Sequence, residues 1–404
     1  MEVKPGYKPT EVGVIPEEWE VRTIGEMFRL INGCAFKPDD WKPSGTPIIR
    51  IQNLNDPSAE FNYSQAPVPE RNRIEAGDLL FAWSGTLGSS FGARVWNGPS
   101  GVLNQHIFKV LMDEQQITLP FSLLVFARVE EDIAKQAHGF KASFVHVKKS
   151  DLVKVDLPLP PLAEQRAIAA ALSDVDGLLG GLDRLIAKKR DLKQAAMQQL
   201  LTGQTRLPGF HGEWEVKTLG DIVEKIVGGG TPSRTNTVFW GNEIPWVTVK
   251  DFATFNPQHS QESITRLGLR NSASNLIPSG TLITSTRMAL GKAVVYAVDV
   301  AINQDLKALF LKPEASVAYL TYWFEHFGHL IDELGSGSTV KGISLVELRR
   351  FPFQAPPKAE QTAIAAVLSE MDGELGKLEQ RREKTRALKQ AMMQELLTGR
   401  TRLI

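Results

Sequence analysis

The same long segment occurs twice in this chain of 404 residues. Residues 161–207 and 357–403 align without a gap at a constant offset of 196, and 30 of the 47 aligned positions are identical. A shorter repeat precedes each copy, because Trp19-Glu-Val-Arg-Thr-Ile-Gly25 returns as Trp214-Glu-Val-Lys-Thr-Leu-Gly220. The chain is therefore a tandem duplication. The blocks between the repeats have diverged, which indicates that the repeated segments share one role and the blocks have two different roles.

Each repeated segment is predicted to form one long helix. A proline precedes the helix, a glutamate lies in its first turn and a glycine follows its last turn. These residues are Pro161, Glu164 and Gly203 in the first copy, and Pro357, Glu360 and Gly399 in the second. About 39 helical residues span roughly 58 Å. So long a helix owes its stability mostly to packing of an apolar face, and we expect a partner surface.

Apolar residues recur along both segments at alternating steps of four and three, which is typical of a coiled coil. The predicted helix-pairing residues are Ile168, Leu172, Leu179 and Leu182, and Ile364, Leu368, Leu375 and Leu378. We expect the two copies to pack on each other as antiparallel helices, with the divergent blocks at opposite ends. The alternative is that each helix packs on its own block. Gly177 and Gly180 recur as Gly373 and Gly376, which predicts close backbone contact, unless glycine is merely tolerated there.

The blocks are predicted to have a mixed α/β (α+β) fold. Short apolar runs bounded by turn residues predict strands at 46–51, 77–83, 244–249, 280–285 and 292–297. Helices are expected around residues 122–135 and 317–334. The expected domains are a lead-in (1–18), a first block (19–157), a first helix with its linker (158–213), a second block (214–354) and a second helix (355–404). Both blocks are expected to be variants of one ancestral fold, giving a pseudo-two-fold repeat.

Composition narrows the class of protein only modestly. The single cysteine, Cys34, excludes an internal disulfide, and no apolar leader or membrane-spanning run is visible, so we expect an intracellular, cytoplasmic protein. The formal net charge is zero. A neutral total neither supports nor excludes binding of nucleic acid, because the distribution of charge on the surface decides that.

Catalytic signatures are absent from the sequence. It contains no Asn-Pro-Pro-Tyr or Asp-Pro-Pro-Tyr tetrapeptide and no glycine-rich loop for a dinucleotide or methyl donor, and Gly291-Lys292 lacks the upstream glycine of a phosphate-binding loop. His326 and His329 stand three residues apart on an expected helix. Without a third ligand nearby, a solvated helical face is a better interpretation than a metal site.

Several weaker signals favour DNA binding. Small polar residues, some of them beside lysine or arginine, fill the expected loops, and Asn104-Gln105-His106 returns as Asn303-Gln304-Asp305. Asparagine and glutamine can read adenine, and arginine and lysine can read guanine. A turn or strand cap is an equally good interpretation of any single one of these residues. The predicted DNA-binding residues are Lys37, Ser84, Thr86, Asn104, Gln105, Lys141 and Lys148, and Ser285, Arg287, Lys292, Asn303, Gln304 and Lys341.

The whole pattern resembles the specificity (S) subunit of type I restriction–modification systems. Two divergent blocks alternate with two near-identical helices, and each block ends in a proline-rich turn that leads into Ala-Glu-Gln. These turns are Leu157-Pro-Leu-Pro-Pro-Leu-Ala-Glu-Gln165 and Phe353-Gln-Ala-Pro-Pro-Lys-Ala-Glu-Gln361. Gly228-Gly-Gly-Thr-Pro-Ser233 and Ile244-Pro-Trp-Val-Thr248 also look like the start of a target-recognition domain of that family. The architecture carries the resemblance, because its short motifs are individually weak.

The resemblance implies a non-enzymatic role. Each target-recognition domain would read one half of a bipartite site in double-stranded DNA. The paired helices would set the spacing and dock two methyltransferase subunits, and motor/nuclease subunits would join for restriction. No cofactor is implied for this chain, because the methyl donor and ATP belong to those partners. Two other functions remain open: a duplicated coiled-coil scaffold that binds only proteins, and a self-sufficient DNA methyltransferase, against which the missing tetrapeptide argues.

Overall fold

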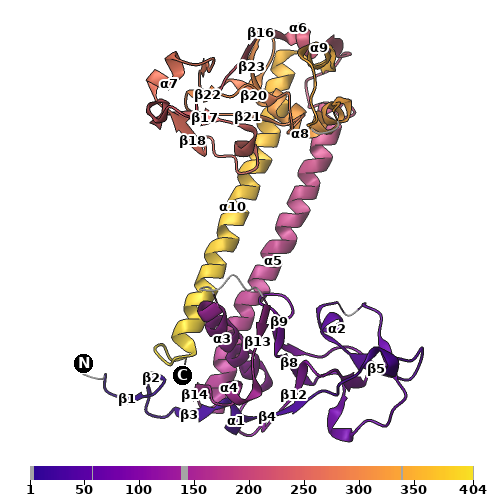
Figure 1. Cartoon of the computed structure of the whole chain (residues 1–404), viewed down its shortest axis with the longest axis vertical. Coiled ribbons are helices and arrows are strands. Elements are labelled where there is room, and N and C mark those ends of the chain that lie inside the picture. The colour runs from indigo at the N-terminus through magenta and orange to yellow at the C-terminus, as the bar shows by residue number, and fades with distance from the viewer. Residues whose placement is uncertain (1–3, 57, 138–143, 338–339, 404) are drawn as a thin grey trace. The chain divides into compact units, whose positions relative to one another are not determined.

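The computed structural model describes residues 4–56, 58–137, 144–337 and 340–403 (Figure 1). The chain forms two compact units. The first consists of Met1–Gly181 and Arg382–Ile404, and the second of Leu182–Arg381. Each unit therefore contains one globular block together with one end of each repeated helix. Among the described residues, no helix has both the length and the apolar character that crossing a bilayer requires.

Both repeated segments are single helices, as predicted. Helix α5 runs over Leu162–Leu201 and helix α10 over Lys358–Leu396. The glycine that follows each helix has a positive φ, +70° at Gly203 and +69° at Gly399. A Cβ added at either position would approach a tryptophan ring to 3.3 Å, that of Trp214 or Trp19. Glycine is therefore needed at both positions for its backbone conformation and for its lack of a side chain.

The first block is built on two four-stranded sheets. One has the order β10-β8-β12-β4 and is antiparallel; its strands are β4 (Phe28–Asn32), β8 (Leu79–Ala82), β10 (Gly92–Val95) and β12 (Ile107–Met112). The other has the order β6-β5-β11-β7; its strands are β5 (Thr46–Ile49), β6 (Asn62–Ser64), β7 (Arg73–Ile74) and β11 (Gly101–Leu103). Strands β5 and β11 are parallel.

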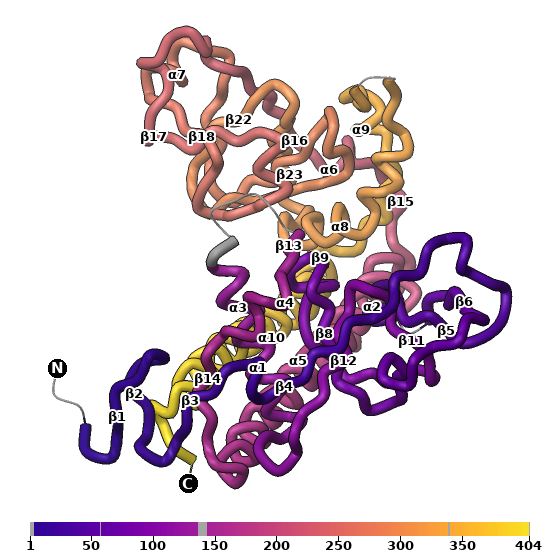
Figure 2. Tube along the Cα trace, turned by 60° about the horizontal axis from the view of Figure 1, so that its bottom comes forward, coloured from indigo at the N-terminus to yellow at the C-terminus, as the bar shows by residue number. Residues whose placement is uncertain are grey.

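Shorter elements complete this block. Helix α3 (Leu119–Ala137) covers strand β10, and β14 (Asp156–Leu159) pairs with β3 (Glu20–Thr23). The hairpin of β1 (Tyr7–Thr10) and β2 (Gly13–Pro16) lies beside the C-terminal end of α10 (Figure 2). A Cβ added at Gly399 would in fact meet the ring of Pro16. The two termini of the chain thus belong to one unit.

The second block repeats the topology of the first. Its sheets have the orders β21-β20-β23-β16 and β18-β17-β22-β19. The strands are β16 (Val223–Gly228), β17 (Trp240–Val247), β18 (Glu262–Ile264), β19 (Leu276–Ile277), β20 (Leu282–Ser285), β21 (Ala293–Val295), β22 (Val300–Ile302) and β23 (Leu306–Leu311). Strands β15 (Glu215–Thr218) and β24 (Pro352–Ala355) pair as β3 and β14 do, and helix α8 (Val317–Leu334) corresponds to α3. The prediction of one fold in two divergent blocks is confirmed.

The helix ends close the core of each block. Ile168 and Leu172, which are fully buried, pack in the first core together with Leu396 and Leu397 from the end of α10. Ile364 and Leu368 pack in the second core with residues from the end of α5, Met197, Leu200 and Leu201. The start of each helix therefore contacts both its own block and the end of the other helix. Packing of a helix on its block and packing of the two helices on each other thus occur together at these positions.

Within each unit the two helices are antiparallel. In the second unit, Lys193 Nζ lies 2.8 Å from Asp372 Oδ1, and Lys189 pairs with Glu374, so the numbering falls along one helix as it rises along the other. In the first unit, Lys389 Nζ lies 2.6 Å from Asp176 Oδ1. This pair repeats Lys193 and Asp372 with the helices exchanged, as the pseudo-two-fold repeat requires. Leu182 and Leu375 are buried, and Leu179 and Leu378 are half-buried.

The mid-helix glycines do not make the close backbone contact that their recurrence suggested. A Cβ added at Gly177, Gly373 or Gly376 would meet no described atom within 4 Å. That prediction is wrong for these three positions. Glycine is therefore tolerated at these three positions without being needed for packing.

Candidate nucleic-acid interface

The Ala-Glu-Gln motif anchors each long helix to its block. Glu164 is fully buried; its carboxylate accepts a hydrogen bond from Trp19 Nε1 (2.8 Å) and one from Arg402 Nε (2.6 Å). Glu360 accepts the same two kinds of hydrogen bond from Trp214 and Arg206. Each arginine follows the other long helix, so one carboxylate joins a block, a helix start and a helix end.

The glutamine of the motif has a similar structural role. The Gln165 Oε1 accepts a hydrogen bond from the Thr118 backbone N–H, and Gln361 Oε1 accepts one from that of Ser316 (2.9 and 2.8 Å). Thr118 and Ser316 immediately precede helices α3 and α8. The identity of the repeated motif therefore reflects an identical joint between helix and block.

The two Asn-Gln pairs lie at one and the same turn of the repeated fold. Asn104 follows β11, and its backbone N–H donates to Ile49 O (3.0 Å); Asn303 follows β22 and donates to Val247 O (3.1 Å). Gln105 and Gln304 come next and are exposed. The sequence correspondence is thus also a structural correspondence, and each block presents one glutamine amide to solvent at this turn.

In the second block this turn adjoins the loop after β20. Arg287 Nη1 donates to Asp305 Oδ1 (3.3 Å), and Asn303 Nδ2 donates to Asp305 Oδ2 (3.1 Å). Ser285 is buried, and its Oγ accepts the Arg287 N–H (3.2 Å). Ser285 and Asn303 are therefore held inside the protein, and burial favours a positioning role for both. Arg287 and Gln304 are the members that solvent reaches.

In the first block Ser84 and Thr86 belong to the short strand β9 (Ser84–Thr86), which pairs with β13 (Phe144–His146). Ser84 is buried, and the Thr86 backbone N–H donates to Ser90 Oγ (2.7 Å). Both residues shape the loop. Direct contact of either with DNA stays a prediction.

The predicted cations divide into paired and exposed ones. Lys341 Nζ lies 2.7 Å from Asp332 Oδ2, so this lysine, like Arg287, already faces a carboxylate. Lys37, Lys148 and Lys292 are exposed. Lys141 lies outside the described residues. The sequence pattern predicted that these cations lie in or near loops. It gave no signal that Asp305 and Asp332 would pair with two of them.

A basic groove that sequence reasoning missed opens in the first block. It has a volume of about 720 Å³, and its lining includes Arg29 from β4, Arg71 and Lys149 but no carboxylate. Lys149 Nζ donates to Leu30 O (2.6 Å). The groove reaches Gly33, where a Cβ would clash with Asn104 O. Three cations far apart in the sequence are thus gathered beside a predicted DNA-binding turn.

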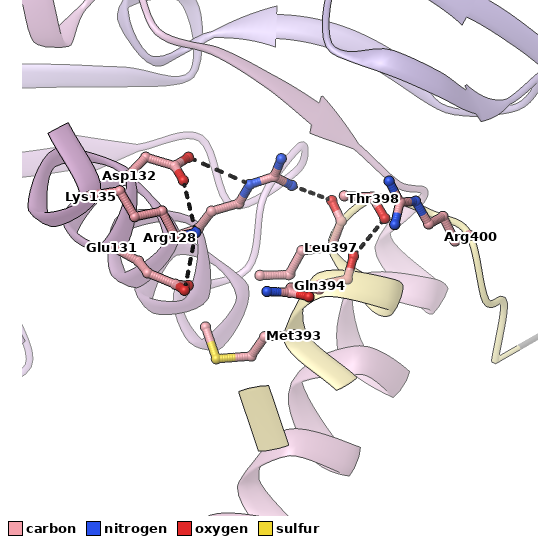
Figure 3. A pocket seen from close by; sticks show the side chains of 9 residues that line it. All are labelled: Arg128, Glu131, Asp132, Lys135, Met393, Gln394, Leu397, Thr398 and Arg400. Carbon is pink, nitrogen blue, oxygen red and sulfur yellow. Dashed lines mark hydrogen bonds and ion pairs between the residues drawn. The ribbon is translucent and has the colours of Figure 1, made fainter. Parts of the chain in front are cut away.

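A smaller cavity lies between α3 and the end of α10 (Figure 3). Its volume is about 230 Å³. The charged side chains that line it have partners: Arg128 Nη1 donates to Leu397 O (3.0 Å), Lys135 Nζ lies 3.1 Å from Glu131 Oε1, and Arg400 faces Glu395, which lies outside the lining. This cavity is therefore part of the joint between helix and block and is not a candidate site.

Metal binding finds no support in the part of the chain that the structure describes. No group of three or more histidine, cysteine or acidic side chains there could hold an ion. His329 Nδ1 lies 3.0 Å from His326 O on the surface of α8, and burial lowers the pKa of His326. His329 is exposed, as the interpretation of a solvated helical face predicts, whereas His326 is half-buried against Phe327.

Comparison with known proteins assigns the chain to a class of DNA-recognition proteins. The family model described as "Type I restriction modification DNA specificity domain" matches residues 16–186 and again residues 211–386. The chain belongs to this family and carries two copies of its domain. It is accordingly a non-catalytic DNA-specificity subunit of a type I restriction–modification system.

The similar proteins extend over nearly the whole chain. The putative type I restriction enzyme MjaX specificity subunit of Methanocaldococcus jannaschii is 25% identical, over 98% of this chain and 97% of the relative. The MjaVIII specificity subunit of the same organism is 24% identical, over 96% and 94%. A chain from a structural study of type I R-M complex assembly aligns with a TM-score of 0.64 and 21% identity, covering 95% of this chain and 99% of that chain. The S subunit from M. genitalium aligns at 0.55 and 16%, covering 98% of both chains.

Proposed function

We propose that each block reads one half of a bipartite target in double-stranded DNA. The paired helices set the distance between the halves and dock two methyltransferase subunits for adenine methylation. Motor/nuclease subunits join the same assembly for restriction, and the complex acts in the cytoplasm. The methyl donor and ATP are bound by those partners.

One observation carries this proposal: two blocks of the same topology have different side chains where the Asn-Gln turn adjoins the loop after β8 or β20. Where the second block has Arg287 and Asp305, the first has Ser84 and His106. The correspondence follows from backbone hydrogen bonds, because Thr286 N–H donates to Asp305 O as Trp83 N–H donates to His106 O. One scaffold with two sets of loop residues suits two different half-sites better than two copies of one protein-binding surface.

The exposed cations fit contact with the phosphate backbone. Lys37 and Lys148 in the first block and Lys292 in the second are exposed on loops or at the starts of short helical turns. The basic groove of Arg29, Arg71 and Lys149 adds a second set. Phosphate contacts position a protein on DNA and make binding fall steeply with salt.

The test uses the full chain expressed with the methyltransferase subunit of its own system. Sequencing of methylated adenines in host DNA is expected to show one bipartite motif, and purified complex should bind a duplex that contains it with strong salt dependence. A scaffold that binds only proteins would leave the methylation pattern unchanged when the blocks are altered. Methyl transfer by the isolated chain would instead support a self-sufficient enzyme.

A further inference from the structure

Arg287 is the one arginine of the loop after β20, and its side chain is 55% exposed. One edge of its guanidinium is held by Asp305, whose side chain is only 9% exposed. Asp305 is in turn fixed by Asn303, which donates to its carboxylate (3.1 Å) and accepts its backbone N–H (3.1 Å). The guanidinium is therefore oriented by a buried acid, and it has further N–H donors on a side chain that is more than half exposed.

The backbone around Arg287 is held equally firmly. Arg287 forms a β-bridge with Gly342, which ties the loop after β20 to the segment that precedes residue 343. The next residue, Met288, has a φ of +68° and donates its N–H to Lys341 O (2.9 Å). A methionine in the left-handed region is strained, and the surrounding contacts maintain that conformation. These backbone contacts hold Arg287 in one position.

Another arginine of the same block, Arg234, has a guanidinium that is more fully engaged. Arg234 donates from both terminal nitrogens to the two oxygens of Glu262, and its Cζ lies 3.9 Å from the ring centroid of Trp240. Both its outer edge and its face are occupied. Arg287 differs, because Asp305 takes a single hydrogen bond from it at 3.3 Å.

The partner that this arrangement recognises must offer acceptors without a negative charge. A phosphate approaching Arg287 would also approach the carboxylate of Asp305, and the like charges repel each other. The O6 and N7 edge of guanine is neutral and has the spacing that a guanidinium fork matches. The corresponding position of the first block carries a buried serine, Ser84, beside His106, so the first block has no arginine–aspartate pair here.

We infer that Arg287 reads a guanine through the major groove in the half-site bound by the second block, and that Asp305 is the residue that positions it. This inference rests on the proposed function and names one specificity-determining residue within it. Loss of the Arg287 guanidinium is expected to lower discrimination against the wrong base at one base pair by roughly 5- to 150-fold. The base preferences at the other positions should stay unchanged.

The experiment uses the full chain in complex with its methyltransferase subunit and a library of randomised duplexes. The parent complex first defines the half-sites by sequencing of bound DNA. Arg287→Ala is expected to remove the preference for guanine at one position of one half-site only. Arg287→Lys keeps the positive charge but loses the paired N–H donors of the guanidinium, so it should retain part of the preference for guanine. Asp305→Asn should weaken the preference for guanine. Its thermal unfolding temperature should equal that of the parent, which shows that the variant is folded. Arg234→Ala is the matched control and should leave every base preference unchanged.

A second measurement removes one hydrogen-bond acceptor from the DNA. Replacing that guanine by 7-deazaguanine takes away N7 and should weaken binding of the parent complex but not of Arg287→Ala. An equal loss for all sequences in a folded Arg287→Ala variant, including complete loss of binding, overturns the inference and makes Arg287 a phosphate contact. Unchanged preferences in that variant also overturn it. If the parent complex prefers no sequence at all, the proposed function fails instead, so the two failures are distinguishable.

Discussion

At the scale of single residues, the buried carboxylates of the two helix starts carry the repeated architecture. Glu164 and Glu360 have no exposed surface, and each satisfies a tryptophan and an arginine that come from other segments. The hydrogen bonds that Arg206 and Arg402 donate to Glu360 and Glu164 raise the pKa of the two arginines, so both stay charged. A buried charge of this kind is stable only while its partners are present.

We predict that Glu164→Ala destabilises the protein by about 1–3 kcal/mol, because it leaves the donors of Trp19 and Arg402 without their acceptor. The free energy of unfolding is measured by urea denaturation followed by tryptophan fluorescence. The control is Glu20→Ala, which removes an exposed carboxylate that pairs with Arg22 and should change stability by less than about 1 kcal/mol. Equal effects of the two substitutions would show that the hydrogen bonds of Glu164 with Trp19 and Arg402 do not contribute to stability.

A second residue-scale prediction concerns Glu130, which is part of helix α3. Burial raises the pKa of its carboxyl, although Oε1 accepts the Ala93 N–H (2.8 Å) and Arg94 lies nearby. A raised pKa in the folded state means that the ionised carboxylate is disfavoured by folding. The contribution of Glu130 to stability is therefore present below its unfolded pKa and is lost as pH rises through its folded pKa.

Glu130→Gln keeps the acceptor without the charge and is expected to raise the melting temperature at pH 8 relative to the parent. The difference should shrink as the pH falls toward 4, where Glu130 is protonated. Thermal unfolding of both proteins across that pH range measures it. A stabilisation that does not change with pH would point to packing as its cause.

At the scale of elements, much of the fold could be predicted from the sequence. The expected helix at 317–334 is α8, and expected strands such as 46–51 and 280–285 contain β5 and β20. Periodicity and turn residues are local signals, which is why these elements were visible. The basic groove could not be predicted from the sequence, because Arg29, Arg71 and Lys149 come together only when the sheets are assembled. The same holds for Asp305 as the partner of Arg287.

The two classes of glycine in the helical segments give an element-scale prediction. Gly373→Ala is expected to stabilise the protein by about 0.5–1 kcal/mol, since alanine is the better helix former and its Cβ meets no atom of the described residues within 4 Å. Gly203→Ala is expected to destabilise by about 1–2 kcal/mol, because it places a Cβ at a φ of +70°. Chemical denaturation of the two variants beside the parent compares these opposite signs. Destabilisation by Gly373→Ala would restore the idea of a close helix contact there.

At the scale of the whole molecule, the duplication explains how one chain can recognise two different half-sites. The joints are repeated almost unchanged, as in the pairs Lys193–Asp372 and Lys389–Asp176. The blocks keep their topology while their loop residues differ. Exchanging residues 19–157 for the block of another family member is therefore expected to change one half of the target only. Mapping of methylated motifs would show it, and a change in both halves would argue against independent reading.

The last prediction concerns the helices as a ruler. We expect the blocks to contact sites about one DNA turn apart, roughly 34 Å. Because the helices are antiparallel within each unit, an insertion in one helix alone would displace pairs such as Lys193–Asp372. Seven residues are therefore inserted in both helices, next to Gly181 and Arg381, where the two units meet in the sequence. This insertion adds two helical turns, about 10.5 Å, and keeps the heptad register.

The expected result is a target whose spacer is longer by about three base pairs, at 3.4 Å each, while both half-sites keep their sequences. Sequencing of methylated host DNA measures the spacer directly. A matched control inserts seven residues into the linker at 208–212, which leaves the length of both helices unchanged and should leave the spacer unchanged. A helix-insertion variant that methylates the parental spacer would show that the separation of the half-sites is not set by the helices, since the added length would then have no effect on where the blocks bind.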